Sequence, residues 1–300
     1  MIKDYFSLAL RNITKRKLRS WLTMIGIFIG IAAVVSLISL GDGMKYAITS
    51  QFSSFGTDKL TIQAGGLNAF GPPGSGAVNK LTTDNVDAIN RITGVKLAIS
   101  RMMRMVKLEF NEEISYESAT NLPEELDKRN LVLEVLNLDL VEGRHLKPTD
   151  KYKVVIGNAI VYKNKFSKAP KLGDNILIED KQFQIVGILE ASGNPMLSSI
   201  VIINDEILRE ILDLDDEVDL IAAQVKNQNE MDKIAEEVNK VMRDERDVDI
   251  GEEDFTVETP AQTLQSVNTI LNVVQAVLVG IAAISLFVGG IGIMNTMYTS

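Results

Sequence analysis

A glycine-rich stretch is the part of this 300-residue chain whose residue types come closest to a site for chemistry. Residues 71–76 read Gly-Pro-Pro-Gly-Ser-Gly, like the start of a phosphate-binding P-loop. In that loop, Lys and then Ser or Thr directly follow the last glycine, so that the ammonium group reaches the terminal phosphates. Here Ala77 and Val78 follow, and Lys80 comes too late. We therefore expect a surface loop rather than a nucleotide site.

Other residues that could catalyse a reaction or hold a metal are isolated. His145 is the single histidine and the chain has no cysteine, so a typical zinc site lacks its ligands. The carboxylates of Glu252, Glu253 and Asp254 are interpreted as a solvated charge run. The sequence therefore predicts a protein that is not an enzyme by itself and that uses no cofactor or metal.

The N-terminal region predicts a membrane anchor. Residues 21–40 contain no charged side chain and as a helix would span about 30 Å, the thickness of a bilayer's hydrocarbon core. The basic residues before this segment include Arg11, Lys15, Arg16, Lys17 and Arg19. Because basic residues stay with the cytoplasm, we expect a transmembrane helix over 20–41 with a cytoplasmic N-terminus. A cleaved signal peptide is the alternative, but the apolar run is too long and no A-x-A-like cleavage site follows.

A second apolar segment closes the sequence. No charged residue occurs from Val267 to Ser300, and residues 270–294 are apolar enough to span a bilayer. By parity, a helix over 267–298 runs back from the outside to the cytoplasm. The prediction is a multi-pass protein of the plasma membrane with a large extracytoplasmic domain over residues 42–266.

The net charge of −9 is distributed unevenly along the chain. Residues 1–40 carry six basic and one acidic side chain, whereas residues 41–266 carry 25 basic and 39 acidic ones. Such an acidic domain repels the phosphates of DNA and RNA, so no nucleic acid partner is expected. Without disulfides the domain must rely on its core, and its length is ample for one.

Hydrophobic patterns predict a β–α–β unit near each end of the large domain. The first unit comprises a strand over 59–63, a helix capped by Thr83, and a hairpin of 95–110 with 114–120 around Asn111-Glu112. The second comprises a strand over 219–225, a helix over 230–246 capped by Asn229, and a strand over 254–258. We expect these units to form one discontinuous subdomain from residues 42–128 and 214–260.

The residues between these units, 129–213, are expected to form an inserted subdomain that is mainly β. Its predicted strands are 152–156, 175–179, 182–189 and 199–203. A tight turn at Asp180-Lys181 is predicted between the second and third of these strands, although it lacks the glycine that such turns prefer.

Small residues in both membrane segments predict close helix packing, because they let helix backbones approach each other in lipid. Gly26 and Gly30 form a GxxxG pair in the first segment. The small residues of the second segment are Ala276, Gly280, Gly289, Gly290 and Gly292. Residues 1–19 show the pattern of an amphipathic helix on the cytoplasmic membrane surface. That helix either receives a push from a cytoplasmic partner or serves only as a topology signal.

Short motifs along essentially the whole chain are similar to those of one known family. They are Ala9-Leu10-Arg11-Asn12, Lys17-Leu18-Arg19-Ser20 and residues 22–27 at the N-terminus, Gly289 to Asn295 at the C-terminus, and residues 142–144, 172–174 and 186–189 between them. These motifs resemble those of MacB-type ABC transporter permeases, which combine an FtsX-like permease with a MacB-like periplasmic core domain.

The resemblance implies a membrane protein with two transmembrane helices flanking a large α+β extracytoplasmic domain. That domain would have a porter-like subdomain, built from the two β–α–β units, and the inserted subdomain. The function implied is a permease subunit of an ABC-type export or extrusion system, which transmits ATP-driven motion of a separate ATPase to the extracytoplasmic domain. The implied partners are the ABC ATP-binding subunit, a second copy in a homodimer, the lipid membrane and an extracytoplasmic adaptor. Arg16 and Arg19 are the candidate ATPase contacts.

Family members continue past the second helix into a coupling segment and two further helices, so we expect this sequence to be truncated after residue 300. Two alternatives stay open. A two-span receptor whose ectodomain binds a ligand has the same layout of helices and domain. A permease of the same fold that releases lipoproteins or regulates cell-wall hydrolases keeps the architecture and changes the task. The residues do not identify a transported substrate.

Overall fold

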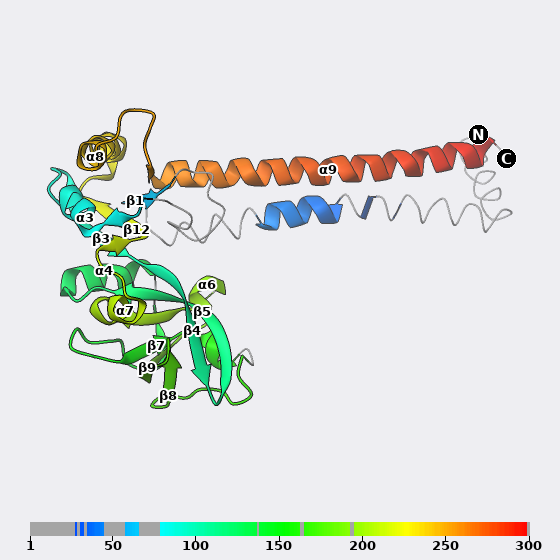
Figure 1. Ribbon diagram of the computed structural model, residues 1–300. Coiled ribbons are helices and arrows are strands. Elements are labelled where there is room, and N and C mark those ends of the chain that lie inside the picture. The colour runs from blue at the N-terminus through cyan, green and yellow to red at the C-terminus, as the bar shows by residue number, and fades with distance from the viewer. Residues whose placement is uncertain are drawn as a thin grey trace. The chain divides into compact units, whose positions relative to one another are not determined.

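The computed structural model describes residues 28, 31–32, 35–44, 58–65, 79–136, 138–162, 165–192 and 195–298. The chain divides into two compact units (Figure 1). Residues 51–263 form the first, called the large domain here. Residues 1–50 and 264–300 form the second, called the helical unit.

The first lobe of the large domain is a four-stranded antiparallel sheet with two helices packed on one face. The strand order is β13-β1-β12-β3. The elements are β1 (Lys59–Ala64), β2 (Leu81–Thr82), α3 (Thr83–Asn90), β3 (Val95–Arg101), β11 (Glu217–Val218), β12 (Leu220–Val225), η1 (Gln228–Glu230), α8 (Met231–Arg246) and β13 (Phe255–Glu258). This order is that of a split β–α–β fold, in which segments from both ends of the domain share one sheet.

Local patterns explain the elements of the first lobe. On α8 the side chains of Ile234, Val238 and Met242 are buried at spacings of four residues, which places them on one helix face. In β1 every second side chain, including Leu60 and Ile62, is buried against the same core. The lobe is therefore held together by an apolar layer between its sheet and its two helices.

Both predicted helix caps in this lobe were wrong by one or two residues. Thr82 rather than Thr83 precedes α3, and its N–H donates to the side chain of Asn85 at 3.1 Å. Asn227 rather than Asn229 caps the short turn η1 before α8, because its side chain accepts from the Asn229 N–H. The N-cap of α3 thus lies one residue before the predicted one, and α8 itself begins after Glu230 without a side-chain cap.

The second lobe is a closed barrel. Its ring follows the order β9-β7-β10-β5-β4-β8, and β8 pairs back with β9. The barrel strands are β4 (Met103–Phe110), β5 (Glu113–Leu122), β7 (Lys153–Ile156), β8 (Asn175–Ile178), β9 (Lys181–Leu189) and β10 (Val201–Asn204), with β6 (Leu140–Gly143) added beside β9. Its helices are α4 (Leu126–Leu136), α5 (Asn158–Tyr162), α6 (Pro195–Ser198) and α7 (Asp205–Leu212). Closure pairs the strands with one another and leaves few free edges.

The boundary of the second lobe differs from the predicted one. The single strand predicted over 95–110 is cut at Met102, so β3 lies in the first sheet and β4 lies in the barrel. The second lobe therefore begins at Met103 and not at residue 129. The physical reason is that the Asn121 side chain accepts the Met102 N–H at 2.8 Å and replaces the ladder of the first sheet there.

Two tight turns connect barrel strands. Asn111 and Glu112, with φ angles of 51° and 64°, join β4 and β5 where the hairpin was predicted. Glu179 and Asp180, with φ angles of 47° and 61°, join β8 and β9, one residue earlier than the predicted Asp180-Lys181 turn. Two successive left-handed residues match the right-handed twist of the strands, even without glycine.

The helix α9 runs without interruption over the 39 residues Pro260–Tyr298, and it begins in the large domain and continues into the helical unit. At 1.5 Å per residue it is about 58 Å long, nearly twice the thickness of a bilayer's hydrocarbon core. Within the described residues, Pro260–Ile281 is long and apolar enough to cross a membrane. The helical segment Val35–Met44 also belongs to this unit, and there the Gln275 amide lies 3.4 Å from the Asp42 carboxylate.

Several predicted features lie outside the described residues. They are the amphipathic helix over 1–19 with Arg16 and Arg19, the GxxxG pair Gly26 and Gly30, and the glycine-rich stretch 71–76. Ala276, Gly280, Gly289, Gly290 and Gly292 all lie within α9. A Cβ added to Gly280 or Gly290 would meet no described atom within 4 Å, so packing among the described parts of the chain does not require glycine there.

Candidate functional site

The start of α9 is the first candidate site, because one residue joins it to the sheet of the first lobe. Thr259 alone separates β13 from α9, and it is 2% exposed. Its hydroxyl accepts the Gln262 N–H at 3.2 Å, and the Gln262 side chain accepts the Thr259 N–H at 2.9 Å. This reciprocal capping box, with Pro260 at the first helical position, starts the helix without a flexible spacer.

A second bond ties the first turn of α9 to the strand itself. The Thr263 hydroxyl donates to the Glu258 carboxylate at 2.8 Å, and Glu258 pairs with Thr61 of β1. The helix start, its cap and the edge of the sheet therefore form one hydrogen-bonded unit. No helix cap was predicted here, although the pattern Thr-Pro-Ala-Gln at 259–262 could have indicated one.

The second candidate site lies where the two lobes meet, and we call it the lobe clasp: Arg101, Arg104, Asn121, Asp205 and Asp219. The chain crosses between the lobes at Met102 and again between α7 and β12. Sequence reasoning singled out none of the clasp residues, because their partners are distant in the chain: Met103 and Asp219 are 116 residues apart.

The first half of the clasp surrounds Asn121, which is fully buried. Its amide oxygen accepts the Met102 N–H, and its amide nitrogen donates to the Ser100 carbonyl at 3.2 Å and to Asp205 at 2.5 Å. Arg101 donates to the Asn121 carbonyl at 2.6 Å and to the Thr120 hydroxyl at 2.7 Å. Burial lowers the pKa of Arg101 to about 10, with Asp205 opposing the shift, so the guanidinium stays charged at neutral pH.

The second half surrounds the buried carboxylate of Asp219. It accepts the Met103 N–H at 2.9 Å and pairs with Arg104 at 3.0 Å, while the Asp219 N–H donates to the Arg101 carbonyl at 3.1 Å. Arg104 also pairs with Glu217 at 2.8 Å. Burial raises the pKa of the Asp219 carboxyl, and the Met103 N–H and the Arg104 guanidinium oppose that shift. This half joins the second crossing directly to the first.

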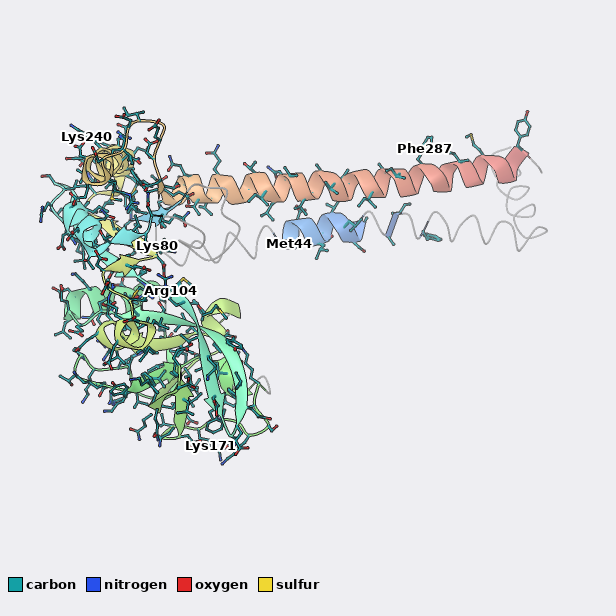
Figure 2. All side chains as sticks on the ribbon, in the orientation of Figure 1. Met44, Lys80, Arg104, Lys171, Lys240 and Phe287 are labelled. Atoms are coloured by element: carbon teal, nitrogen blue, oxygen red, sulfur yellow. The ribbon has the colours of Figure 1, made fainter. Side chains whose placement is uncertain are left out.

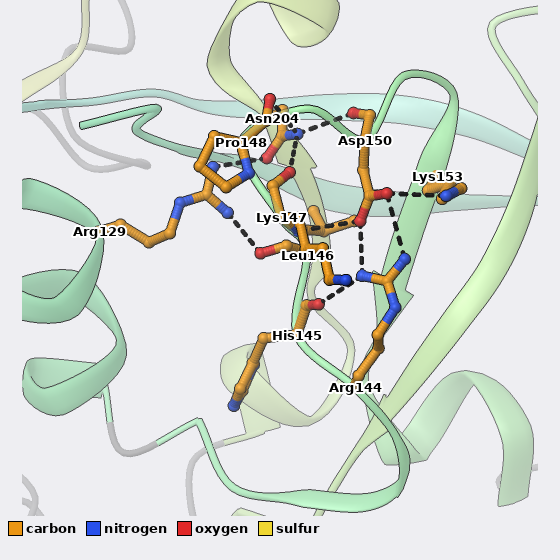
Figure 3. Close-up of polar contacts among 9 residues, drawn as sticks. All are labelled: Arg129, Arg144, His145, Leu146, Lys147, Pro148, Asp150, Lys153 and Asn204. Atoms are coloured by element: carbon orange, nitrogen blue, oxygen red, sulfur yellow. Dashed lines mark hydrogen bonds and ion pairs between the residues drawn. The ribbon is translucent and has the colours of Figure 1, made fainter. Parts of the chain in front are cut away.

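The loop before β7 contains a third polar cluster, drawn in Figure 3. The Asp150 carboxylate accepts from Arg144 at 2.6 and 3.1 Å, from Lys153 at 2.7 Å and from the Lys147 N–H at 2.9 Å. The Arg144 guanidinium holds the pKa of the Asp150 carboxyl well below its usual range, and Lys153 and the Lys147 N–H act in the same direction. This network closes the loop onto the start of β7.

Two buried side chains attach the same loop to the rest of the second lobe (Figure 3). Asn204 donates to the carbonyls of Lys147 and Asp150, both at 2.8 Å, and accepts from Arg129 of α4 at 2.9 Å. Arg129 also donates to the Leu146 carbonyl at 2.6 Å. The cluster thus joins α4, the loop and β10, and its geometry indicates a structural role.

His145 and the acidic residues 252–254, which were first considered for catalysis or metal binding, have contacts that the sequence did not predict. The His145 carbonyl accepts from Arg144 at 2.8 Å, and burial lowers the pKa of its imidazole. The charge run at 252–254 is less solvated than predicted, since Glu253 pairs with Arg243 at 3.1 Å and Asp254 pairs with Arg246 at 2.6 Å. Among the described residues, no three His, Asp or Glu side chains are grouped to hold a metal ion.

Comparison with known proteins gives consistent matches. Residues 20–241 match the model of the MacB-like periplasmic core domain. An uncharacterized ABC transporter permease of Methanocaldococcus jannaschii is 35% identical over 302 residues, which cover 100% of this chain and 72% of that protein. The macrolide export ATP-binding/permease protein MacB of Wolinella succinogenes is 27% identical over 99% of this chain, which spans 45% of the length of MacB.

Solved structures show the same fold. The periplasmic region of MacB from Actinobacillus actinomycetemcomitans superposes with a TM-score of 0.55 at 16% sequence identity, covering 72% of this chain and 95% of that structure. The family-model match and the sequence relatives agree with this fold along nearly the whole chain. The chain therefore belongs to the family of ABC transporter permeases with a MacB-like periplasmic core domain, which are membrane proteins whose large domain lies outside the cytoplasm.

Proposed function

We propose that this chain is the permease subunit of an ABC-type export or extrusion system, and that it transmits motion rather than catalysing a reaction. A separate ATP-binding subunit hydrolyses ATP in the cytoplasm, and the membrane helices carry the resulting movement to the large domain. The N-terminus, with Arg16 and Arg19 as candidate ATPase contacts, lies in the cytoplasm. An extracytoplasmic adaptor is a further proposed partner. Relatives named for export, such as MacB, support export over lipoprotein release or ligand sensing.

The direct connection at Thr259 carries this proposal. A helix that begins one residue after a strand, with both ends of its cap hydrogen-bonded, has no segment that can absorb movement. A tilt or rotation of α9 therefore acts on β13, and through the ladder of β13 with β1 it acts on the first lobe.

Insertion of a flexible Gly-Ser linker between Glu258 and Thr259 is expected to uncouple the large domain from the ATPase. The linker keeps the capping box of α9 but separates it from β13. The experiment includes the ATP-binding subunit, and a cysteine that replaces Lys240 carries a spin label. Electron paramagnetic resonance should show that the distance between the labels of two copies depends on ATP. The change should disappear in the linker variant while ATP hydrolysis continues.

The matched control is the same linker inserted between Ile250 and Gly251, in the exposed loop between α8 and β13. Ile250 is 83% exposed, so the insertion disturbs little packing and leaves the helix connection intact. This variant should keep the ATP-dependent change. A preserved change with the linker before Thr259 would contradict transmission through α9, and no change in the unmodified protein would contradict the proposed function.

An apolar stripe on α9 supports the proposed homodimer. Its residues follow one another at alternating spacings of three and four and are exposed within the described chain: Ile270, Val273, Val277, Ile284, Phe287, Ile291, Met294 and Tyr298, with Gly280 in the same register. Sustained over four heptads, this spacing is the pattern of helices that pair side by side.

Cysteine crosslinking tests this pairing, and because the chain has no cysteine each introduced thiol is unique. Val277→Cys lies on the stripe and should form a disulfide-linked dimer on mild oxidation of membranes. Val279→Cys is also exposed but lies off the stripe, so it should remain monomeric on a denaturing gel. Equal crosslinking at both positions, or none at either, would argue against a dimer through this face.

A further inference from the structure

The barrel lobe is joined to the first lobe by two chain crossings, an arrangement that often produces a hinge. Hinges are a few residues at the ends of elements that absorb changes in φ and ψ, with few contacts across them. Relative motion is therefore the default expectation for two lobes connected in this way. The residues at these crossings do not resemble a hinge, because they make many contacts between the two lobes.

At the first crossing, the backbone is held from both sides. Met102 is fully buried, and its N–H is bound by the side chain of Asn121 from the barrel lobe. The amide group of Asn121 makes three hydrogen bonds while fully buried. Rotation of the backbone at Met102 would break these bonds and leave buried polar groups without partners, which is unfavourable.

At the second crossing, Asp219 binds the first crossing directly. Its carboxylate accepts the Met103 N–H and pairs with Arg104, and its own N–H donates to the Arg101 carbonyl. Arg209 of α7 donates to the Glu217 carbonyl at 3.1 Å and so holds the segment that leads to Asp219. The two crossings cannot move apart without breaking these contacts.

Apolar packing supports the same conclusion. Leu97 and Ile99 of β3 and Ala222 of β12 belong to an apolar cluster with residues of the barrel lobe. The barrel-lobe members that are buried there are Leu122, Leu131, Val132, Leu138, Leu146, Val155, Leu189, Ile200 and Ile202. The two lobes therefore share a dry core, and bending between them would expose part of it to water.

We propose that the lobe clasp fuses the two lobes into one rigid body, so that the barrel lobe follows every displacement of the first lobe. The barrel acts as a fixed extension of the first lobe, and it moves whenever the sheet that is attached to α9 moves. This consequence for transport rests on the proposed function, but the rigid connection itself does not.

Two spin labels measure the connection in the full chain reconstituted in lipid. Cysteines replace the exposed residues Lys240 on α8 and Lys171 on the barrel lobe, whose positions are shown with Arg104 in Figure 2. The unmodified clasp should give one narrow distance distribution. Asn121→Ala combined with Asp219→Ala should broaden that distribution, with the circular dichroism of the chain preserved.

The control removes an exposed ion pair that lies wholly within the barrel lobe. Asp180→Ala breaks the pair with Lys107 and should leave the distribution narrow. Should the double clasp variant fail to fold, Asp219→Asn is the second variant, since it retains an acceptor for the Met103 N–H and removes the charge that faces Arg104. It should broaden the distribution less.

A broad or two-peaked distribution in the unmodified chain would overturn the proposal, because the lobes would then bend relative to each other. A narrow distribution in the clasp variants would overturn the role of the clasp. The measurement needs no ATPase, so its outcome is independent of the linker experiment on α9.

Discussion

Asp150→Ala is expected to lower the free energy of unfolding of the large domain by about 3 kcal/mol, because it removes the buried acceptor of Arg144, Lys153 and the Lys147 N–H. This loss lies at the lower end of the range for breaking a buried ion pair, since Arg144 and Lys153 keep about a third of their side-chain surface in water. Urea unfolding of residues 51–263, followed by circular dichroism, measures it.

The pH dependence of this effect has a definite sign. The folded-state pKa of Asp150 lies below its usual value of 3.8, so its stabilising contribution is fully present above that pH. The contribution is lost as the pH falls from that value through the folded-state pKa, because the unfolded chain takes up a proton at Asp150 before the folded domain does. The difference between the native domain and the Asp150→Ala variant should therefore be constant near neutral pH and shrink below pH 3.8.

Glu206→Ala is the control for Asp150→Ala. Glu206 pairs with Lys151, the neighbour of Asp150, but the side chains of this pair are 61% and 65% exposed and 3.5 Å apart. Solvent screens such a pair, so the variant should change the unfolding free energy by less than about 1 kcal/mol. Equal losses in the two variants would mean that the buried network is not what stabilises the loop.

Gly143→Ala is expected to have the larger effect of two matched glycine substitutions. Gly143 has a φ of 85°, and a Cβ there would lie 2.3 Å from the Val186 carbonyl oxygen and 2.9 Å from the Cα of Gly187, its partner across β6 and β9. The strands would have to separate, and we expect a loss of about 4 kcal/mol or failure to fold.

Gly173→Ala separates the conformational contribution from the steric one. Gly173 has nearly the same φ, 89°, but a Cβ there would meet no described atom within 4 Å. Only the preference of non-glycine residues against a positive φ then opposes the substitution, at a cost of about 1 kcal/mol. Similar losses at the two positions, measured by the same urea unfolding, would show that the close approach of β6 to β9 is not limiting.

Gly143 and Gly173 also show what the sequence could and could not explain about single residues. Both lie in short motifs, Glu142-Gly143-Arg144 and Leu172-Gly173-Asp174, that resemble the family pattern. The resemblance identifies them without saying why glycine is needed. The structure shows one reason at Gly173, a positive φ, and two reasons at Gly143, a positive φ and a backbone too near to admit a side chain.

Features that depend on nearby residues were predictable from the sequence alone. The helix α8 and the strand β1 follow from periodic burial over a few residues, and the Asn111-Glu112 hairpin follows from two strand patterns around a short turn. The charge-free segments and the motifs at both ends indicated a membrane permease, and the family comparison confirmed that class.

Only the tertiary structure decided where one lobe ends and the other begins, and which polar residues hold them. The sequence pattern from Val95 to Phe110 reads as one strand, because periodicity records which side of a strand is buried and not which sheet receives it. Asn121, Arg101 and Asp219 acquire their roles from partners tens of residues away along the chain. Such contacts leave no local pattern, since they form only when the folded chain brings both crossings together.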